Sequence, residues 1–331
     1  MTIDWQRIDD TPRLLMEAEL KPIQGSRFQP TGFPDLGAAT YEAPGKVDMV
    51  LVESAQSMAN RMEAICWDEA SASPHSALKG MPYVSVTLWD SGDTTTSILE
   101  AHRLNSPYIM RDEGFADKLR VEAGMPGRKE REKVGEFNRA ALARAVFKYD
   151  PGSVLHGVFL EKLLGLARLQ RCLSGFIEAS NSSVADSGGV KNDRIAPSPG
   201  SLRQIGLEVS AAEGYGNVPF HRAEYTAELI TAYFNLDLAQ IRAYGLEESA
   251  ERFLVTLALW KVRKFLETGL RLRTACDLDV CSDLEVTRPE GFVVPPTRDL
   301  EDDLPGLIGA CASEGLFADQ PVTELTFSKE K

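Results

Sequence analysis

The segment from Arg13 to Ile23, RLLMEAELKPI, constrains the fold of this chain more than any other stretch. Its residues alternate in kind, with Leu14, Met16, Ala18 and Leu20 on one parity and mainly charged side chains on the other. A period of two predicts a half-buried β-strand with a single apolar face. We therefore expect a sheet that is covered on one side.

Apolar residues at helical spacing predict an amphipathic helix over Leu51–Trp67 and a second, clearer one over Glu247–Glu267, which Gly269 would end. Further strands are expected at Tyr83–Trp89, Val154–Leu160, Leu173–Ala179, Glu228–Tyr244 and Leu270–Val280, and further helices at Phe137–Phe147 and Asp299–Glu314. The segment Thr94–Leu104 fits a helix or a strand equally well. Helices on one antiparallel sheet give an α+β architecture, and the split β-α-β order predicts a ferredoxin-like or RRM-like core.

Three segments interrupt this pattern. Gln24–Gly45 is rich in glycine and proline, Met110–Glu136 is charged and punctuated by glycine, and Ser180–Ser201 is rich in Ser, Gly, Asn and Asp. Glycine and proline at this density predict irregular structure. We expect one domain over residues 1–331, with insertions at about 110–136 and 180–201 that are irregular or mobile.

The composition excludes several classes of protein. No apolar run approaches the roughly 18–20 residues of a membrane helix, so we expect no membrane partner. The first ten residues lack the apolar core of a signal peptide, which makes the cytoplasm the expected location. Five scattered cysteines fit reduced core thiols better than disulfides or a zinc site, so no metal is expected.

The formal net charge of -13 argues against a uniformly basic nucleic-acid-binding surface. Local clusters rather than global charge decide such binding, and basic residues are concentrated between Arg120 and Lys148. Acidic residues gather from Asp299 to Asp319, where Glu301, Asp302 and Asp303 are consecutive.

Common catalytic motifs are absent. The sequence contains no G-x-x-x-x-G-K-[ST], no G-x-G-x-x-G fingerprint, no H-E-x-x-H and no G-x-S-x-G. We therefore predict no enzyme activity, no catalytic residue and no cofactor. The alternative is a metal-independent ribonuclease that uses His102, His156 or His221.

Three irregular stretches carry groups that suit RNA. In Gln24–Ala39, Arg27 offers a guanidinium to phosphate, Gln29 offers neutral hydrogen bonds, and the side chains of Phe28 and Phe33 could stack on bases. The same stretch reads equally well as a packed loop whose phenylalanines fill the core. Two further stretches also fit an RNA contact. The first begins at Ser180 and reads SNSSVADSGGVKNDR, and it fits a solvated linker as well. The second begins at Gly214 and reads GYGNVPFHR, and it fits a turn with core aromatics as well.

Six segments in order resemble one protein family, the backbone subunit of type I-U (also called I-G) CRISPR effector complexes in the RAMP superfamily. They are RFQPTGFPDLGAATY (Arg27–Tyr41), LVESAQSMANRMEA (Leu51–Ala64), LEAHRLNSPYI (Leu99–Ile109), KYDPGSVLHGVFL (Lys148–Leu160), GGVKNDR (Gly188–Arg194) and GYGNVPFHRAEYT (Gly214–Thr226).

The resemblance implies an RRM-like palm with a large inserted thumb and finger-like elements. It implies a non-catalytic subunit that binds CRISPR RNA and presents it for pairing with a target DNA strand. Its partners would be other effector-complex subunits and further copies of itself, joined head-to-tail. Residue chemistry inside the matching segments then gives the expected RNA-binding set: Arg27, Gln29, Phe33, Gln56, Asn60, His102, Arg103, Lys191, Arg194, Asn217, His221 and Arg222.

Overall fold

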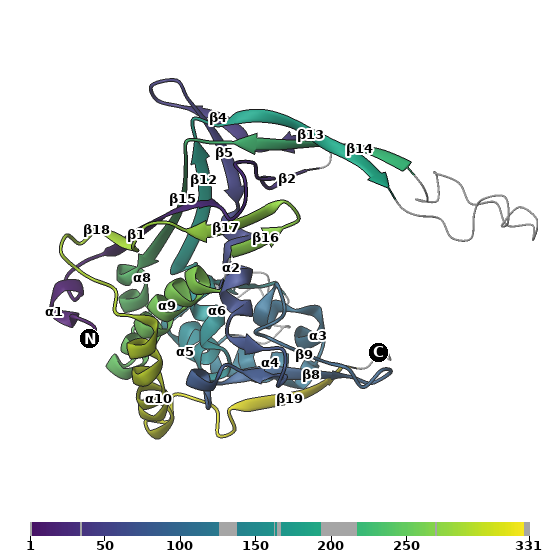
Figure 1. Cartoon of the computed structure of the whole chain (residues 1–331). Helices are drawn as coiled ribbons and strands as arrows, with labels where there is room; N and C mark the ends of the chain where they lie inside the picture. The colour runs from purple at the N-terminus through teal and green to yellow at the C-terminus, as the bar shows by residue number, and fades with distance from the viewer. Residues whose placement is uncertain are drawn as a thin grey trace, which may run out of the picture.

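A computed structural model describes residues 2–33, 35–125, 138–161, 163, 167–192, 217–268 and 270–327 (Figure 1). The fold is mixed α+β, with a curled antiparallel sheet as its largest element. No helix in the described ranges is long and apolar enough to cross a membrane.

The large sheet has eight strands, and every pairing in it is antiparallel. From one edge to the other its strands are β16 (Leu270–Arg273), β17 (Cys276–Val280), β1 (Arg13–Pro22), β15 (Leu229–Asp237), β12 (Leu173–Ser180), β5 (Val47–Glu53) and β4 (Thr40–Ala43). The eighth strand, β18 (Glu285–Arg288), pairs with the first half of β1. The predicted strand over Arg13–Ile23 is therefore confirmed and lies near the middle of the sheet.

One face of this sheet is buried, as the alternation of β1 predicts. Leu14, Met16, Ala18 and Leu20 are all at most 3% exposed. The helices α2 (Ala55–Ala64) and α9 (Glu248–Glu267) pack on this face and contact each other. Met16 lies opposite Phe234 of β15, whose ring meets Phe265 of α9 at 6.3 Å. Each such buried side chain stabilises the fold by about 1.5–3 kcal/mol relative to an exposed one.

Four central strands and two helices follow one another along the chain as β1, α2, β12, β15, α9 and β17. In the sheet, these strands lie in the order β17, β1, β15, β12. We call the large sheet, together with α2 and α9, the sheet lobe.

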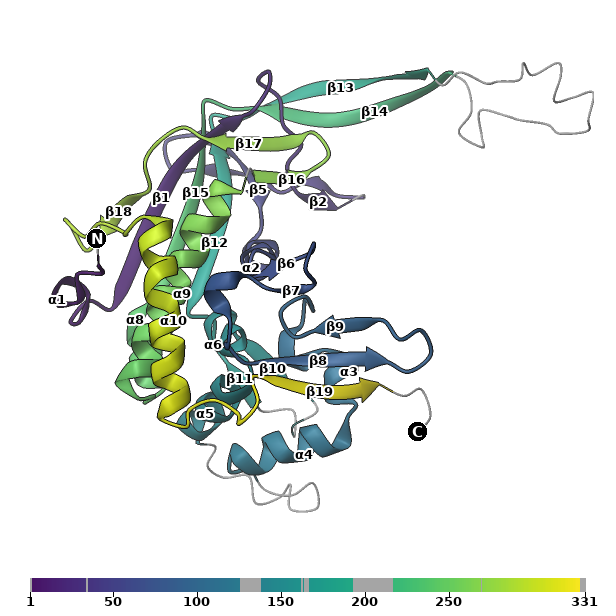
Figure 2. The same ribbon diagram turned by 60° about the horizontal axis from the view of Figure 1, so that its bottom comes forward.

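A second part of the molecule, the lower lobe, lies below the sheet in Figure 2. It contains a three-stranded sheet of β19 (Val322–Phe327), β8 (Tyr83–Leu88) and β9 (Thr94–Thr96), in which β19 and β8 run parallel. Around it lie α3 (Pro107–Met110), α4 (Glu113–Glu122), α5 (Arg139–Tyr149), α6 (Pro151–His156) and a small hairpin of β10 (Val158–Leu160) and β11 (Ala167–Leu169). The helix α10 (Thr297–Ser313) packs on α9.

A long hairpin extends away from both lobes (Figures 1 and 2). Its strands, β13 (Ser183–Asn192) and β14 (Asn217–Thr226), pair from Ser183 opposite Thr226 to Asn192 opposite Asn217. Ten extended residues span roughly 33 Å. The expectation of irregular structure is therefore wrong for these residues of Ser180–Ser201 and Gly214–Arg222, and residues 193–216 lie outside the described part.

Several other predicted boundaries are wrong for a shared reason, which is a helix cap or turn inside the predicted element. Ser54 caps α2, so Leu51–Glu53 belongs to β5 and not to a helix. Asp150 and Asp237 cap α6 and α8 (Leu238–Ala243), which replace parts of two predicted strands. Ala275, at φ 59°, turns the predicted long strand Leu270–Val280 into the β16–β17 hairpin.

The segments expected to be irregular also contain regular structure. Gln24–Gly45 holds β4 and the short pair β2 (Gly32–Phe33) and β3 (Gly37–Ala38). Met110–Glu136 holds α4, and residues 126–136 lie outside the described part. Thr94–Leu104 contains β9 followed by turns. The helices predicted at Phe137–Phe147, Glu247–Glu267 and Asp299–Glu314 are confirmed as α5, α9 and α10.

Candidate functional site

A cleft of about 440 Å³ lies at the foot of the long hairpin, and we call it the hairpin-foot cleft. It unites residues from three distant parts of the chain: the β2–β3 loop region, the strand β14 and the strand β16. The sequence-predicted residues in its wall are Gln29, Phe33, His221 and Arg222.

Backbone hydrogen bonds hold one wall of this cleft. Phe28 exchanges two bonds with Tyr225 of β14, at 2.9 and 2.8 Å, and is itself 1% exposed. The Gln29 N–H donates to the carbonyl of Ala275, and the Thr31 N–H donates to that of Val52. This short segment therefore ties the hairpin to the β16–β17 turn and to β5.

The two phenylalanines of this segment have different roles. Phe28 is buried in the core, whereas Phe33 is 72% exposed and lines the cleft. Beside Phe33, Gly32 lies so close to β3 that a Cβ atom there would clash with the Gly37 carbonyl oxygen. The sequence left a core plug and an exposed contact equally open, and the structure assigns one residue to each.

Two arginine side chains meet at one carboxylate at the hairpin foot. Glu224, 9% exposed at its side chain, forms ion pairs with both Arg27 and Arg222 at 3.3 Å. Arg27 also donates to the Ser187 hydroxyl at 2.8 Å. Two guanidinium groups that meet at one carboxylate keep cationic donors together at the hairpin foot, which suits an anionic ligand.

Arg273 is a cleft residue that sequence reasoning missed. Its guanidinium donates to the carbonyls of Gln29 and Val52, at 3.1 and 3.0 Å, and pairs with the buried carboxylate of Glu53. Arg61 of α2 pairs with the same carboxylate at 3.6 Å. Arg273 lies within the predicted strand Leu270–Val280, and the actual turn at Ala275 is not part of that prediction.

A second cleft, of about 660 Å³, lies between the start of α2 and the lower lobe, and we call it the arginine cleft. Three of the sequence-predicted residues line it, namely Gln56, His102 and Arg103. Asn60 lies against it through a hydrogen bond from Arg103 at 3.4 Å. Sequence reasoning missed Arg168 and Arg171, which line the same cleft.

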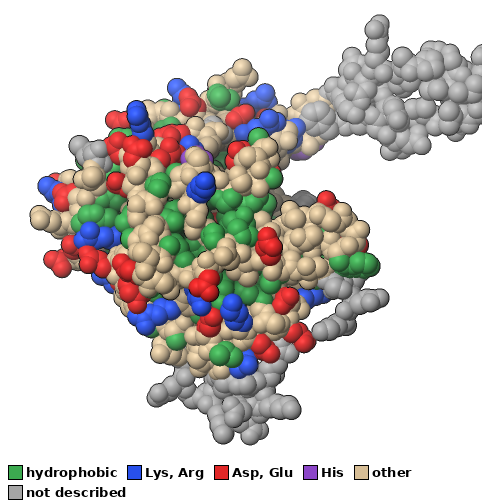
Figure 3. Space-filling view, turned by 90° about the horizontal axis from the view of Figure 1, so that it is seen from below, with side chains coloured by type: hydrophobic (Ala, Val, Ile, Leu, Met, Phe, Trp, Pro, Cys, Tyr) green, Lys and Arg blue, Asp and Glu red, His purple; other side chains and the backbone are tan. Residues whose placement is uncertain are grey.

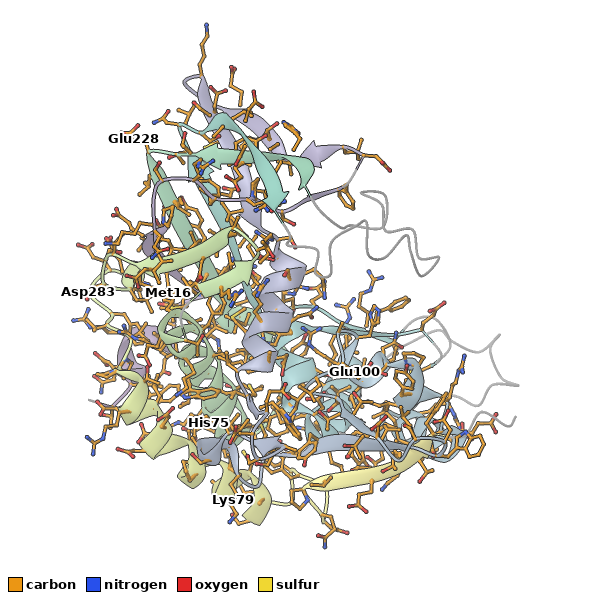
Figure 4. The ribbon with its side chains drawn as sticks, turned by 45° about the vertical axis from the view of Figure 1, so that its right-hand side comes forward. Met16, His75, Lys79, Glu100, Glu228 and Asp283 are labelled. Carbon is orange, nitrogen blue, oxygen red and sulfur yellow. The ribbon has the colours of Figure 1, made fainter. Side chains whose placement is uncertain are left out.

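Arg103 is held in an unusual position. It is 4% exposed and has a φ of 52°, a left-handed conformation that is uncommon for a residue other than glycine. Glu100, in the lower lobe (Figure 4), accepts hydrogen bonds from Ser106 and Thr95, at 2.9 and 2.7 Å. These bonds connect the chain on either side of Arg103. The Arg103 Nε is buried without a hydrogen-bond partner.

Arg171 links both walls of the arginine cleft. Its guanidinium donates to the His156 carbonyl at 3.2 Å, to the Ala55 carbonyl at 3.1 Å and to the Gln56 side chain at 2.8 Å. Burial, followed by repulsion from Arg103, lowers the pKa of Arg171. The two guanidinium groups therefore repel each other.

Behind the arginine cleft lies a buried cluster of charged groups. The Glu63 carboxylate accepts from Lys261 of α9 at 2.8 Å, and lies 3.4 Å from His156 and 3.9 Å from Arg103. Lys261 is 0% exposed. Burial and then repulsion from Lys261 lower the pKa of His156 well below its ordinary value, so this imidazole is neutral. Burial and then Glu63 raise the pKa of Asp150 to about 6.

A family model described as "CRISPR-associated protein GSU0053 (Cas_GSU0053)" matches residues 14–184, which is more than half of the chain. The chain belongs to this family. No curated protein matches it.

Two solved structures show partial similarity to this family member. One is titled "CRISPR RNA-guided surveillance complex, pre-nicking", with 14% identity, a TM-score of 0.40, and coverage of 80% of this chain and 73% of that one. The other is Csc2 of Thermofilum pendens, with 13% identity, a TM-score of 0.30, and coverage of 95% and 81%.

The remaining predicted residues lie away from the two cleft walls or outside the described part. Lys191 and Asn217 form the last described pairs of the hairpin, and nothing is described of their side chains. Arg194 lies outside the described residues.

The histidines of the ribonuclease alternative do not form one cluster. His102 and His156 line the arginine cleft, but His156 is buried, whereas His221 lies at the hairpin foot and is 75% exposed at its side chain.

The described residues contain no group of three or more His, Cys, Asp or Glu side chains that could hold a metal ion. The cysteines are all free, as the sequence predicts. Cys66, Cys172, Cys276 and Cys311 are buried, but Cys281 is exposed, so the expectation of a core position is wrong for that residue.

Proposed function

We propose that this chain is the RNA-binding backbone subunit of a type I-U (I-G) CRISPR effector complex. One observation carries the proposal: residues chosen from the sequence as RNA contacts, in two segments far apart in the chain, meet in the hairpin-foot cleft. There Arg222 and Arg273 offer guanidinium groups to phosphate, the exposed ring of Phe33 offers a surface for a base, and Arg27 adds a further guanidinium through the Glu224 carboxylate that it shares with Arg222.

The topology supports an RRM-like palm with one domain over residues 1–331. The connection β1-α2-β12-β15-α9-β17 and the spatial order β17-β1-β15-β12 correspond to the split β-α-β arrangement of ferredoxin-like cores. In this proposal the β13–β14 hairpin is the thumb, and the lower lobe supplies the finger-like elements.

The acidic composition is compatible with RNA binding through local clefts. On the face seen from below, Lys and Arg side chains are scattered among Asp and Glu rather than gathered in one basic surface (Figure 3). RNA would then follow the two arginine-lined clefts, and the acidic surface would face other protein chains. These partners are further copies of this chain, in head-to-tail contact, and other subunits.

Within the acidic run, Glu301 already contacts Trp260 and Lys264 of its own chain at 3.1 Å. Asp302 is exposed, so it is the better candidate for a contact between subunits.

The role is non-catalytic in this proposal. The complex would act in the cytoplasm and present the guide RNA for pairing with a target DNA strand, without cutting either. The burial of His156 supports this, since a general base must exchange protons with substrate at its site.

Binding of single-stranded RNA by nuclease-treated protein at low salt tests the proposal, with fluorescence polarisation as the measurement. Replacing Arg27 and Arg222 by Gln should weaken binding and reduce the dependence of log K on log salt by about 0.7 for each phosphate that the variant no longer neutralises. RNA length after incubation is read in the same samples. We expect no shortening.

Arg13→Gln is the matched control, because Arg13 also pairs with a carboxylate, that of Asp237 at 2.8 Å, but lines neither cleft. The proposal fails if the protein binds no RNA, alone or with its partner subunits. A cleavage product that disappears in His102→Ala would instead support the ribonuclease alternative.

A further inference from the structure

One wall of the arginine cleft is a stacked pair of side chains that the proposed function does not use. Phe159 of β10 and Arg168 of β11 lie opposite each other in the small hairpin. The guanidinium carbon of Arg168 lies 4.6 Å from the centre of the Phe159 ring. Both residues line the cleft, and Phe159 is 38% exposed. An exposed planar pair of this kind can stack on a nucleobase through the ring or through the guanidinium.

The other wall of the cleft offers cationic donors. Arg103 is almost fully buried; its Nε has no hydrogen-bond partner and lies 3.9 Å from the Glu63 carboxylate, while its two terminal nitrogens make only long hydrogen bonds to Ala101 and Asn60, at 3.5 and 3.4 Å. Arg171 lines the same cleft and repels Arg103. An anion in the cleft would give the weakly bonded terminal nitrogens of Arg103 a stronger partner and would reduce the repulsion between the two cations.

Neutral amides complete the set of groups that a nucleotide needs. Gln56, Asn105 and Gln170 line the same cleft and can accept and donate hydrogen bonds to the edge of a base. The cleft volume of about 660 Å³ lies within the range of about 300–1,000 Å³ that is usual for small-molecule sites.

We propose that the arginine cleft holds a single nucleotide of the bound RNA, with its base stacked on the Phe159–Arg168 pair and its phosphate at Arg103. The inference rests on the proposed RNA-binding function. It assigns to this cleft the recognition of one unstacked nucleotide, whereas the hairpin-foot cleft contacts the RNA backbone.

A double-mutant cycle between protein and RNA tests this assignment. Short single-stranded RNAs, each with one abasic nucleotide at a different position, are titrated by fluorescence polarisation into the full-length protein and its Phe159→Ala variant. We expect Phe159→Ala to weaken binding of intact RNA by about 5- to 100-fold, the range for loss of one base stack. One abasic position should weaken binding to the wild-type protein by the same factor as Phe159→Ala weakens binding of intact RNA. That position should cause no further loss of affinity in the variant.

Arg252→Ala is the matched control, since Arg252 stacks on Trp5 at 5.3 Å and lies outside both clefts. Arg168→Ala should behave as Phe159→Ala does, and Arg252→Ala should leave binding unchanged. Phe159→Leu, which keeps the apolar volume but removes the aromatic ring, guards against a loss caused by misfolding and should also lose the coupling to the abasic position.

The inference is overturned if wild-type protein binds RNA but Phe159→Ala weakens binding no more than Arg252→Ala. It is also overturned if each abasic position reduces the affinity for the variant by the same factor as it reduces the affinity for the wild-type protein. If the wild-type protein binds no RNA at all, the proposed function fails and this inference fails with it.

Discussion

The two clefts hold arginine residues in different ways. At the hairpin foot, the arginine side chains pair with Glu224 and Glu53 and remain partly exposed, at 56% for Arg27, 26% for Arg222 and 24% for Arg273. In the arginine cleft, Arg103 is 4% exposed at its side chain and shares the buried carboxylate of Glu63 with the fully buried Lys261. The first arrangement can adjust to a ligand, whereas the second is fixed before any ligand arrives.

Removing one carboxylate from each region should reveal this difference most strongly. Glu63→Ala leaves Lys261 buried without a counter-charge, and we expect a loss of about 3–5 kcal/mol in the free energy of unfolding. Glu53→Ala should lower the free energy of unfolding by less, about 1–3 kcal/mol. Arg61 and Arg273 are partly exposed, so water can solvate the charge that the carboxylate leaves, and each guanidinium still has a backbone carbonyl as a partner. Urea denaturation measures both.

The double variant Glu63→Ala with Lys261→Met is the control, because it removes both buried charges and should recover part of the lost stability. Equal losses in Glu63→Ala and Glu53→Ala would contradict the comparison between a fixed and an adjustable cleft.

A smaller effect should appear when pH is varied. The pKa of Asp150 is raised to about 6 from 3.8, so the folded state takes up a proton first and gains stability as pH falls from about 6 to about 4. The pKa of His156 is lowered well below 6.5, so the unfolded state takes up a proton first and stability is lost as pH falls below about 6.5. The two contributions oppose each other.

Single substitutions should therefore separate the two slopes. Asp150→Asn, which keeps an oxygen for capping Ser153, should make stability relative to wild type fall as pH decreases from 6.5 to 4.5, by at most about 1.4 kcal/mol per pH unit. His156→Gln should show the opposite slope. The groups around both residues are Glu63, Lys261, Arg103 and Arg171. Parallel stability curves for wild type and both variants would refute the opposing titrations.

The smallest expected change in stability concerns Phe33. Because its side chain is 72% exposed, Phe33→Ala should alter the free energy of unfolding by less than about 0.5 kcal/mol while it weakens RNA binding. Phe28→Ala, five residues away and buried, should cost about 3–5 kcal/mol and serves as the contrast. A large stability loss in Phe33→Ala would remove this residue from the list of ligand contacts.

The same comparison shows how far sequence reasoning reaches. Alternation identified β1 and its buried side correctly because the two faces of that strand differ in polarity along its whole length. It failed for Leu51–Glu53, where three strand residues continue in helical spacing into α2, although Ser54 gave a recognisable N-cap signal. It also failed at Ser183–Asn192, where polar, glycine-containing residues form a strand because β14 pairs with them.

For the site, local residue chemistry found Gln29, Phe33, His221 and Arg222, since each lies in a conspicuous glycine-rich segment. It missed Arg168, Arg171 and Arg273, which sit in ordinary strand or turn sequence. Their roles arise from contacts with residues such as Ala55 and Gln29, which are far away along the chain. No local pattern could show those pairings.

The long hairpin has a mechanical consequence. β13 follows β12 after two residues, Asn181 and Ser182, and β14 enters β15 after two more, Ala227 and Glu228. The hairpin is thus a lever arm whose two strands continue directly into the middle of the large sheet. A load applied to its far end would produce torque at Phe28 and Tyr225, the bridge at its base, and would reach the sheet through covalently continuous strands. Movement of the arm and the shape of the hairpin-foot cleft are therefore mechanically linked.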